Sequence, residues 1–295
     1  MPNVEPPESG GSPWRAGLRT LAHDRSATAG LLVLVVLAVI AIAARHVAPY
    51  PPNAQPDIVG LKNAAPSLAH PFGTDQYSRD VLSRIIFGAR VSLSVAFLSV
   101  VVAATVGTAY GAIAGYVGGV VDTGMMRTVD ALLAVPRVLL LIAVATLWDG
   151  VEVKGLVLLL GLTGWFGVSR LVRTLVLSAR EDEFVTAARA LGASHARILV
   201  LHILPQVISS VLVAATLAVG NVIVIEAGLT YLGMGVQPPY ASWGSVFHDG
   251  MESGVASAWW ISVSAGVALI ITVLAVNLVA DGLREALNTR QLPAR

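Results

Sequence analysis

Two groups of residues in this sequence could take part in chemistry: a charged segment at 178–204, and single polar side chains inside long apolar runs. Glu226 and Asn221 belong to the second group. An acid in an apolar run that crosses a membrane is costly to place there, so Glu226 is a candidate to meet the ammonium end of a substrate. The alternative for both residues is structural: a hydrogen bond to a neighbouring helix or loop.

The segment 178–204 predicts two short helices joined by a glycine turn. Asp182 and Glu183 put acids at the positive end of the first helix. Gly192 suits the end of that helix, and Ser194 can cap the next one. Such a helix pair can be a docking element that a cytoplasmic partner protein binds and moves, or an interfacial connector with no partner. The small residues that would let a partner approach the first helix are Ala187, Ala188 and Ala190.

Several kinds of chemistry are excluded by what the sequence lacks. There is no cysteine, hence no disulfide, thiolate metal site or thiol nucleophile. His195 and His202 have no further ligand at metal-binding spacing, so no metal site is predicted. No GxxxxGK[ST] phosphate loop is present, so the chain cannot hydrolyse ATP alone. An intramembrane enzyme would need a reactive constellation on facing helices, and the sequence offers none.

The composition is that of an integral membrane protein. Of the 295 residues, 55% are hydrophobic and only 13% are charged. Soluble domains have roughly 25% charged residues, so this chain has too little polar surface to cover a soluble globule. The net charge of +1 lacks the strongly basic balance that is typical of proteins that bind nucleic acid. A lipid bilayer is therefore the expected environment, and no nucleic-acid partner is expected.

Six apolar runs predict about six transmembrane helices. About 20 apolar residues cross the ~30 Å hydrocarbon core as a helix. The first run, 27–44, meets this length, although a cleaved signal peptide ending at Ala41-Ile42-Ala43 is the alternative. The further runs lie at about 91–116, 131–148, 153–178, 206–232 and 257–280.

The segment between the first two runs is polar and rich in proline, so it cannot lie in lipid. It ends in an amphipathic stretch that predicts a helix at the membrane surface. Ser78 suits its N-cap, and Asp80 and Arg84 have the spacing of an i,i+4 ion pair.

Small residues and basic residues predict how the helices pack and which way they cross. Gly107, Gly111 and Gly115 recur every four residues, which lets two helix backbones approach closely. Most of the 19 Lys and Arg residues fall on one side if the N-terminus is cytoplasmic, with Arg127 and Arg137 counted in a cytoplasmic loop. The positive-inside rule therefore predicts both termini in the cytoplasm.

Four stretches resemble one family. The stretch 183–194, EFVTAARALGAS, is similar to the EAA loop of binding-protein-dependent ABC importers, with Thr186 where the commonest motif has Glu. The stretches 70–80 (HPFGTDQYSRD), 226–239 (EAGLTYLGMGVQPP) and 277–287 (NLVADGLREAL) resemble motifs of C-type permease subunits in dipeptide, oligopeptide and nickel importers, with Ala280 in place of a glycine. Together they identify the chain as similar to that subfamily over nearly everything after residue 20.

The resemblance implies a fold, a mechanism and partners. The fold is the type I ABC importer permease fold, all-α, in a prokaryotic cell membrane. The partners are a homologous B-type permease, two ATPase subunits (or one fused chain), an extracytoplasmic binding protein and a peptide substrate. ATP and Mg²⁺ bind the ATPase subunits, and no cofactor binds this chain. The residues expected to couple to the ATPase are Glu183, Ala187, Ala188, Arg189, Leu191, Gly192 and Ala193, and the candidate pore-lining residues are Glu226 and Asn221.

Two rival functions remain beside the peptide importer. The first is a nickel or metal-chelate importer, but the predicted transmembrane helices contain almost no histidine. The second is an ATP-independent transporter, but paired charges at the midplane and an inverted repeat are missing.

The expected organisation follows from the apolar runs and the resemblance. The expected segments are a cytoplasmic tail at 1–26, the first transmembrane helix at 27–47, an extracytoplasmic segment with its interfacial helix at 48–87, a permease core of five helices at 88–282 with the coupling loop at 179–204, and a cytoplasmic tail at 283–295.

Overall fold

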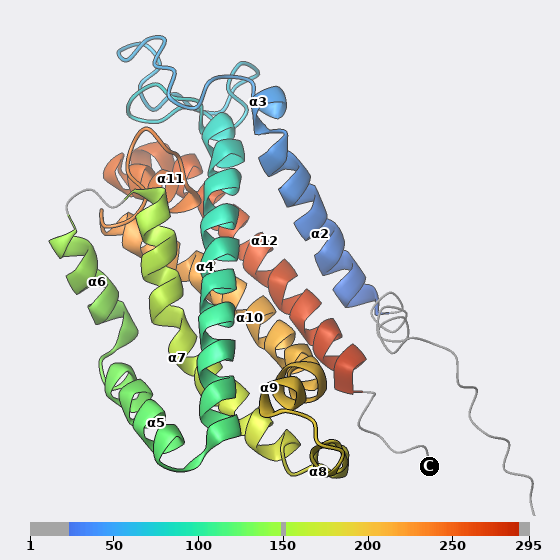
Figure 1. Ribbon diagram of the computed structural model, residues 1–295. Helices are drawn as coiled ribbons and strands as arrows, with labels where there is room; N and C mark the ends of the chain where they lie inside the picture. Colours follow the sequence, from blue (N-terminus) through green and yellow to red (C-terminus); the bar gives the residue numbers. More distant parts are fainter. Residues whose placement is uncertain (1–23, 149–151, 289–295) are drawn as a thin grey trace, which may run out of the picture.

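The computed structural model describes residues 24–148 and 152–288, and within these ranges every regular element is a helix (Figure 1). Five helices are long and apolar enough to cross a membrane, and a bent pair can make a sixth crossing. The prediction of an all-α membrane protein with about six transmembrane helices is confirmed. The helices are α2 (Arg25–Ile42), α3 (Ala44–Val47), α4 (Val81–Val117), α5 (Gly119–Leu133), α6 (Arg137–Leu147), α7 (Val153–Ala179), α8 (Glu183–Ala190), α9 (His195–Arg197), the π-helix η1 (Ile198–Ile203), α10 (Leu204–Tyr231), α11 (Trp243–Glu252) and α12 (Val255–Asn288).

The expected continuous span at 131–148 is instead the end of α5 and the whole of α6, which meet at an angle of 77°. Pro136 lies at the break and supplies no N–H to a preceding turn, so one helix cannot run through it. With 11 residues, α6 is only about 16 Å long, roughly half the hydrocarbon thickness. The crossing therefore needs both halves of the broken helix.

The expected interfacial helix before the second span is not a separate element. Its residues form the first turns of α4, which runs without a break for 37 residues. Asp80, not Ser78, is the N-cap, and its carboxylate accepts from the backbone N–H of Ser83 at 2.8 Å. The other carboxylate oxygen lies 2.9 Å from Nδ1 of His70. Both carboxylate oxygens of Asp80 are thus engaged, one by the backbone N–H of Ser83 and the other by His70. The predicted Asp80–Arg84 ion pair is wrong.

Arg84 is buried in an ionic cluster that ties the loop at 48–80 to α11. Its guanidinium lies 2.7 Å from Oδ2 of Asp75 and also pairs with Asp249 of α11. Arg79 bridges the same two acids, at 2.7 Å and 2.9 Å. Arg84 is 3% exposed and Asp75 is fully buried. The amphipathic face expected to meet the membrane surface is therefore covered by protein, because its charges find partners there.

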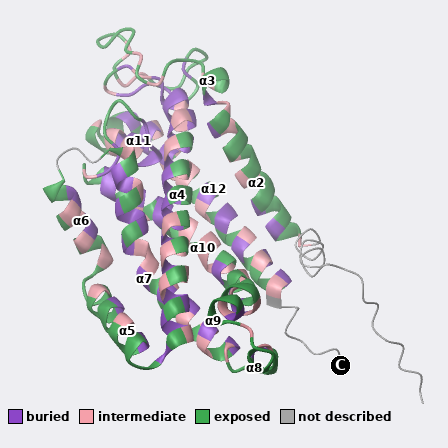
Figure 2. Ribbon diagram, in the orientation of Figure 1, coloured by how far each residue is buried: buried purple, intermediate pink, exposed green. Residues whose placement is uncertain are grey.

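The three glycines of α4 form a close seam with α7, as predicted. A Cβ at Gly115 would lie 2.7 Å from the carbonyl oxygen of Arg173, and one at Gly107 would lie 2.8 Å from that of Trp165. A Cβ at Gly111 would meet the carbonyl oxygen of Ser169. Only residues without a side chain allow two helix backbones to approach so closely. Figure 2 shows the buried residues concentrated where α4 and α7 meet the other core helices.

The first described helix, α2, lies along α12 and α4 at the side of the bundle (Figure 1). Gly30 is its point of closest approach, where a Cβ would meet the carbonyl oxygen of Ala275 at 2.7 Å. Its outward face is apolar and exposed, as at Leu32 and Val39, which suits contact with lipid. This packing favours a transmembrane helix over a cleaved signal peptide.

The predicted tails fall mostly on residues 1–23 and 289–295, which lie outside the described part of the chain. The first six residues of the expected C-terminal tail, 283–288, are helical and continue α12.

The glycine seam can be tested with one substitution. Gly111→Ala should lower the free energy of unfolding by about 1–3 kcal/mol, because the new methyl group meets α7 backbone that cannot move away without separating the helices. Gly167→Ala on α7 is the control, since a Cβ there meets nothing within 4 Å. Thermal unfolding in detergent should show a lower midpoint for the first variant alone; equal midpoints would contradict the seam.

The ionic cluster makes a second prediction. Asp75→Asn leaves Arg84 buried beside a neutral amide and should cost about 3 kcal/mol or more. Asp130→Asn is the matched control: it breaks the Arg170–Asp130 pair, in which both side chains are about half exposed, and should cost about 1 kcal/mol or less. The midpoints of thermal unfolding of the two variants are measured side by side. Similar decreases in the two midpoints would argue against a buried cluster.

Candidate functional site

The segment predicted to couple to a partner forms helix α8, a glycine turn, the short helix α9 and the π-helix η1. Helix α8 begins at Glu183 and ends at Ala190. Gly192 has φ +82°, and the N–H of Ala193 donates to the carbonyl oxygen of Ala188 at 3.1 Å. These are features of a Schellman turn, which glycine favours because the left-handed conformation strains other residues. The predicted order of helix, glycine turn and helix is confirmed.

One side of α8 anchors it to the bundle. Val185 is fully buried and belongs to a cluster with Val176 of α7 and Ile198 of η1. Ala188 and Ala193 are half-buried against the same cluster. Burial of a valine side chain contributes about 1.5–3 kcal/mol, which is enough to hold so short a helix in place.

The other side of α8 faces outward at one end of the molecule. Leu191 is 89% exposed, and Phe184 is also exposed. Apolar side chains presented together at a surface suit contact with another protein. The further predicted coupling residues on this surface are Glu183, Ala187, Arg189 and Gly192, all exposed.

Ion pairs and hydrogen bonds join the base of this segment to the helices that cross the membrane. Arg180, just after α7, donates to the carbonyl oxygen of Gly115 at the end of α4 at 3.1 Å. Arg173 of α7 makes two hydrogen bonds to Asp122 of α5, at 2.5 Å and 2.6 Å. A displacement of α8 would therefore be carried to α4, α5 and α7 together.

Between α9 and α10 the chain forms the π-helix η1 (Ile198–Ile203). Ser194 caps α9, and the Tyr116 hydroxyl lies 3.0 Å from Nδ1 of His195. A π-helix is wider than an α-helix and is frequently found at functional sites. Sequence analysis did not predict it, because no composition rule distinguishes a π-helical run such as ILVLHI from an α-helical one.

Glu226 is fully buried and lies among hydrogen-bond donors. The hydroxyl of Thr230 donates to it at 2.9 Å, and the hydroxyl of Ser92 on α4 at 3.1 Å. Ser92 in turn accepts from the backbone N–H of Trp243, the first residue of α11. In this structure Glu226 thus joins α10 to α4 near α11.

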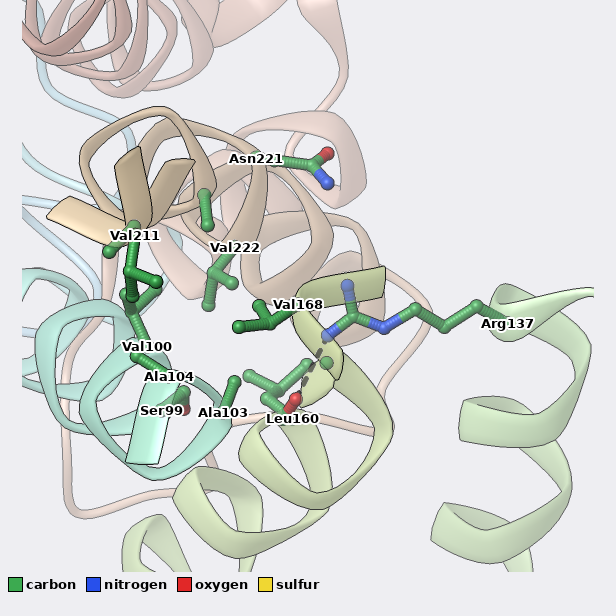
Figure 3. A pocket seen from close by; sticks show the side chains of 13 residues that line it. Ser99, Val100, Ala103, Ala104, Arg137, Leu160, Val168, Val211, Asn221 and Val222 are labelled. Atoms are coloured by element: carbon green, nitrogen blue, oxygen red, sulfur yellow. Dashed lines mark hydrogen bonds between the residues drawn. The ribbon is translucent and has the colours of Figure 1, made fainter. Parts of the chain in front are cut away.

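Asn221 lies elsewhere, beside a small cavity between α4, α6, α7 and α10 (Figure 3). Its side chain is exposed and makes no hydrogen bond to another described residue. Arg137 also lines this cavity, reaching across from α6 to α7. The sequence analysis placed Arg137 in a cytoplasmic loop, and this is wrong: it is the first residue of a helix and faces the interior. Pro136, directly before it, was the available signal for a helix break.

Two families of known proteins match the chain. Residues 107–292 match the family described as binding-protein-dependent transport system inner membrane component. Residues 12–66 match the N-terminal TM domain of oligopeptide transport permease C. The first match covers more than half of the chain, including the three seam glycines of α4 and the segment of α8.

Individual proteins are similar over nearly the whole length. The dipeptide transport system permease protein DppC of Alkalihalophilus pseudofirmus is 36% identical, over 98% of this chain and 95% of its own. DppC of Bacillus subtilis is 35% identical, over 92% and 84%. A putative peptide permease protein of Brucella suis is 39% identical, over 96% and 93%. The chain belongs to the family of inner membrane components of binding-protein-dependent transport systems.

Proposed function

We propose that this chain is one of two pore-forming permease subunits of an ATP-driven importer of dipeptides or oligopeptides. Family membership and the peptide permeases among its relatives support the transport role and the substrate class. The observation that carries the mechanism is α8: a short helix anchored by Val185 that exposes Leu191 and Phe184 at one end of the bundle. A second, homologous permease completes the pore.

Helix α8 is the part that an ATPase subunit engages. The chain has no phosphate loop, so ATP and Mg²⁺ bind partner ATPase subunits, and this chain binds no cofactor. Closure of the ATPase pair on ATP moves α8, and the contacts of Arg180 and Arg173 pass the motion to α4, α5 and α7. The pore then opens alternately to the loaded binding protein and to the cytoplasm.

The arrangement of the chain supports a location in the prokaryotic cell membrane with both termini in the cytoplasm. The start of α2, the end of α12 and α8 all lie toward one end of the bundle (Figure 1). Arg180, Arg189 and Arg197 are near that end, as the positive-inside rule expects of a cytoplasmic face. The loop at 48–80 and α11 are at the opposite end, where an extracytoplasmic binding protein docks.

A nickel or metal-chelate importer is the alternative from the same subfamily. The relatives with full-length similarity are described as dipeptide or peptide permeases, and none of the three described above is a nickel permease. The peptide substrate is therefore the proposal that has support.

The first experiment is purification of the complex from native membranes. We expect a second permease and ATPase subunits to co-purify, and peptide-loaded binding protein to stimulate ATP hydrolysis. If the chain purifies alone and transports without ATP, the secondary-transporter alternative replaces the importer.

A substitution at Leu191 tests whether the outward face of α8 is the surface that binds an ATPase subunit. Leu191→Glu should reduce co-purified ATPase and ATP-dependent peptide uptake about tenfold or more, because a charge replaces an apolar contact at the interface. Leu68→Glu is the control for ATPase content alone, as this leucine is also largely exposed and lies at the opposite end. Its ATPase content should equal that of the unchanged protein. Normal ATPase content in the Leu191 variant would exclude α8 as the docking element.

Substitutions at Gly192 test whether the left-handed turn that follows α8 is required for uptake. Gly192→Val should abolish uptake while the protein stays in the membrane, because φ +82° is strained by about 1–2 kcal/mol for a side chain with a Cβ, and more for a β-branched one. Gly192→Asn is the control, since asparagine tolerates the left-handed region and nothing lies within 4 Å of a Cβ there. Equal uptake by both variants would show that the turn conformation is not required.

A further inference from the structure

Arg137 carries a positive charge among apolar helices with no acid paired to it in the described residues. One of its terminal nitrogens donates to the carbonyl oxygen of Leu160 at 2.9 Å, and Nε donates to the Thr163 hydroxyl at 3.4 Å (Figure 3). A guanidinium has five N–H donors, so three have no acceptor within 24–148 and 152–288. A cation in hydrocarbon is costly and usually marks a path for a substrate or ion.

Along the length of the bundle, the cation lies near the middle rather than at either end. Ser99, which lines the same cavity, has eighteen residues of α4 on either side of it. At 1.5 Å per residue, Ser99 is about 27 Å from each end of that helix. Arg137 is therefore too deep for its charge to be that of a loop residue at the interface.

Arg137 lines two cavities. One is small and lies beside Ser99, and the other, larger one lies between α5, α6 and α7. Arg137 and Gly164 line both, and Arg137 is the sole charged residue among the described residues that line either one. Small side chains, such as Ala103 and Ala215, leave the first cavity open. Figure 3 shows the extended side chain of Arg137 reaching from α6 toward α7 at its edge.

The broken helix adds to the positive potential at this place. Helix α6 starts at Arg137 directly after the 77° bend, so its N-terminus lies partway along the bundle and not at one of its ends (Figure 1). The first N–H groups of a helix have no partner within the helix and attract anions. In membrane transporters, half-helices of this kind point their N-termini at anionic groups of the substrate.

We propose that Arg137 is the carboxylate-binding residue of the translocation path and holds the C-terminal carboxylate of a peptide in transit. This inference rests on the proposed function and names the part of the substrate that the chain contacts. Every linear peptide with a free C-terminus has this group, whatever its side chains, so a single cation can serve many peptides. The planar guanidinium binds a carboxylate with two parallel hydrogen bonds. Asn221, on the same cavity, has an amide free to meet the peptide backbone.

The test uses the reconstituted complex in liposomes with binding protein and two forms of one peptide, the free acid and the C-terminal amide, loaded to equal occupancy. Arg137→Gln should lower import of the free acid per ATP hydrolysed by about tenfold or more, the scale of a lost charge-assisted hydrogen bond. Import of the amide should change by less than about twofold. Arg137→Lys, which keeps the charge but cannot form the two parallel hydrogen bonds, should restore only part of the import.

Arg170→Gln is the control, because it removes an arginine of α7 whose partner Asp130 is at the exposed face. Import of both peptide forms by this variant should match that of the unchanged complex. If Arg137→Gln imports the free acid normally, or lowers both forms equally, the residue only joins α6 to α7 and the proposal is wrong. Failure of the unchanged complex to import any peptide would instead count against the proposed function.

A second measurement needs no variant. In the unchanged complex without binding protein, phenylglyoxal modification of Arg137 is followed by mass spectrometry. Excess free-acid peptide should slow the modification of Arg137 and leave that of Arg170 unaffected, and the amide should protect neither. Equal rates of modification with both peptide forms would overturn the proposal even if Arg137→Gln fails to fold.

Discussion

The contact between the backbones of α4 and α7 is the constraint on which the other parts of this protein depend. In a bilayer the hydrophobic effect does not draw helices together, so association relies on close packing. Gly107, Gly111 and Gly115 supply it, because a side chain at any of them would meet α7. The remaining helices pack around this pair: α10 against both of its members, and α2 against α4.

The same pair connects the two ends of the bundle. The first turns of helix α4 lie in the ionic cluster of Arg84, Asp75 and Asp249. In its last turn, the carbonyl oxygen of Gly115 accepts from Arg180 at the start of the α8 segment. Helix α7 leads directly into that segment. Direct contacts therefore run from the α8 segment through α4 to the ionic cluster at the other end of the bundle.

The arginines discussed above differ in how their charge is balanced within the described residues. Arg84, Arg79 and Arg173 each lie against carboxylates that belong to the chain. Arg137 has a carbonyl and a hydroxyl instead, at the edge of two cavities. Since the desolvation cost of a charge is offset mainly by an opposite charge, the difference separates structural cations from one suited to a passing anion.

The sequence by itself determined the class of the protein, the number of crossings and the local form of the α8 segment. Apolar run length, glycine spacing and helix-capping residues act locally, so they can be read without knowing the fold. The tertiary structure alone decided the partners of the charges. Arg84 pairs with Asp249, 165 positions away, rather than with Asp80, four positions away. Glu226 meets Ser92, and Arg137 faces a cavity after the break at Pro136. Burial and ion pairing depend on which helices lie side by side, and no local pattern specifies that.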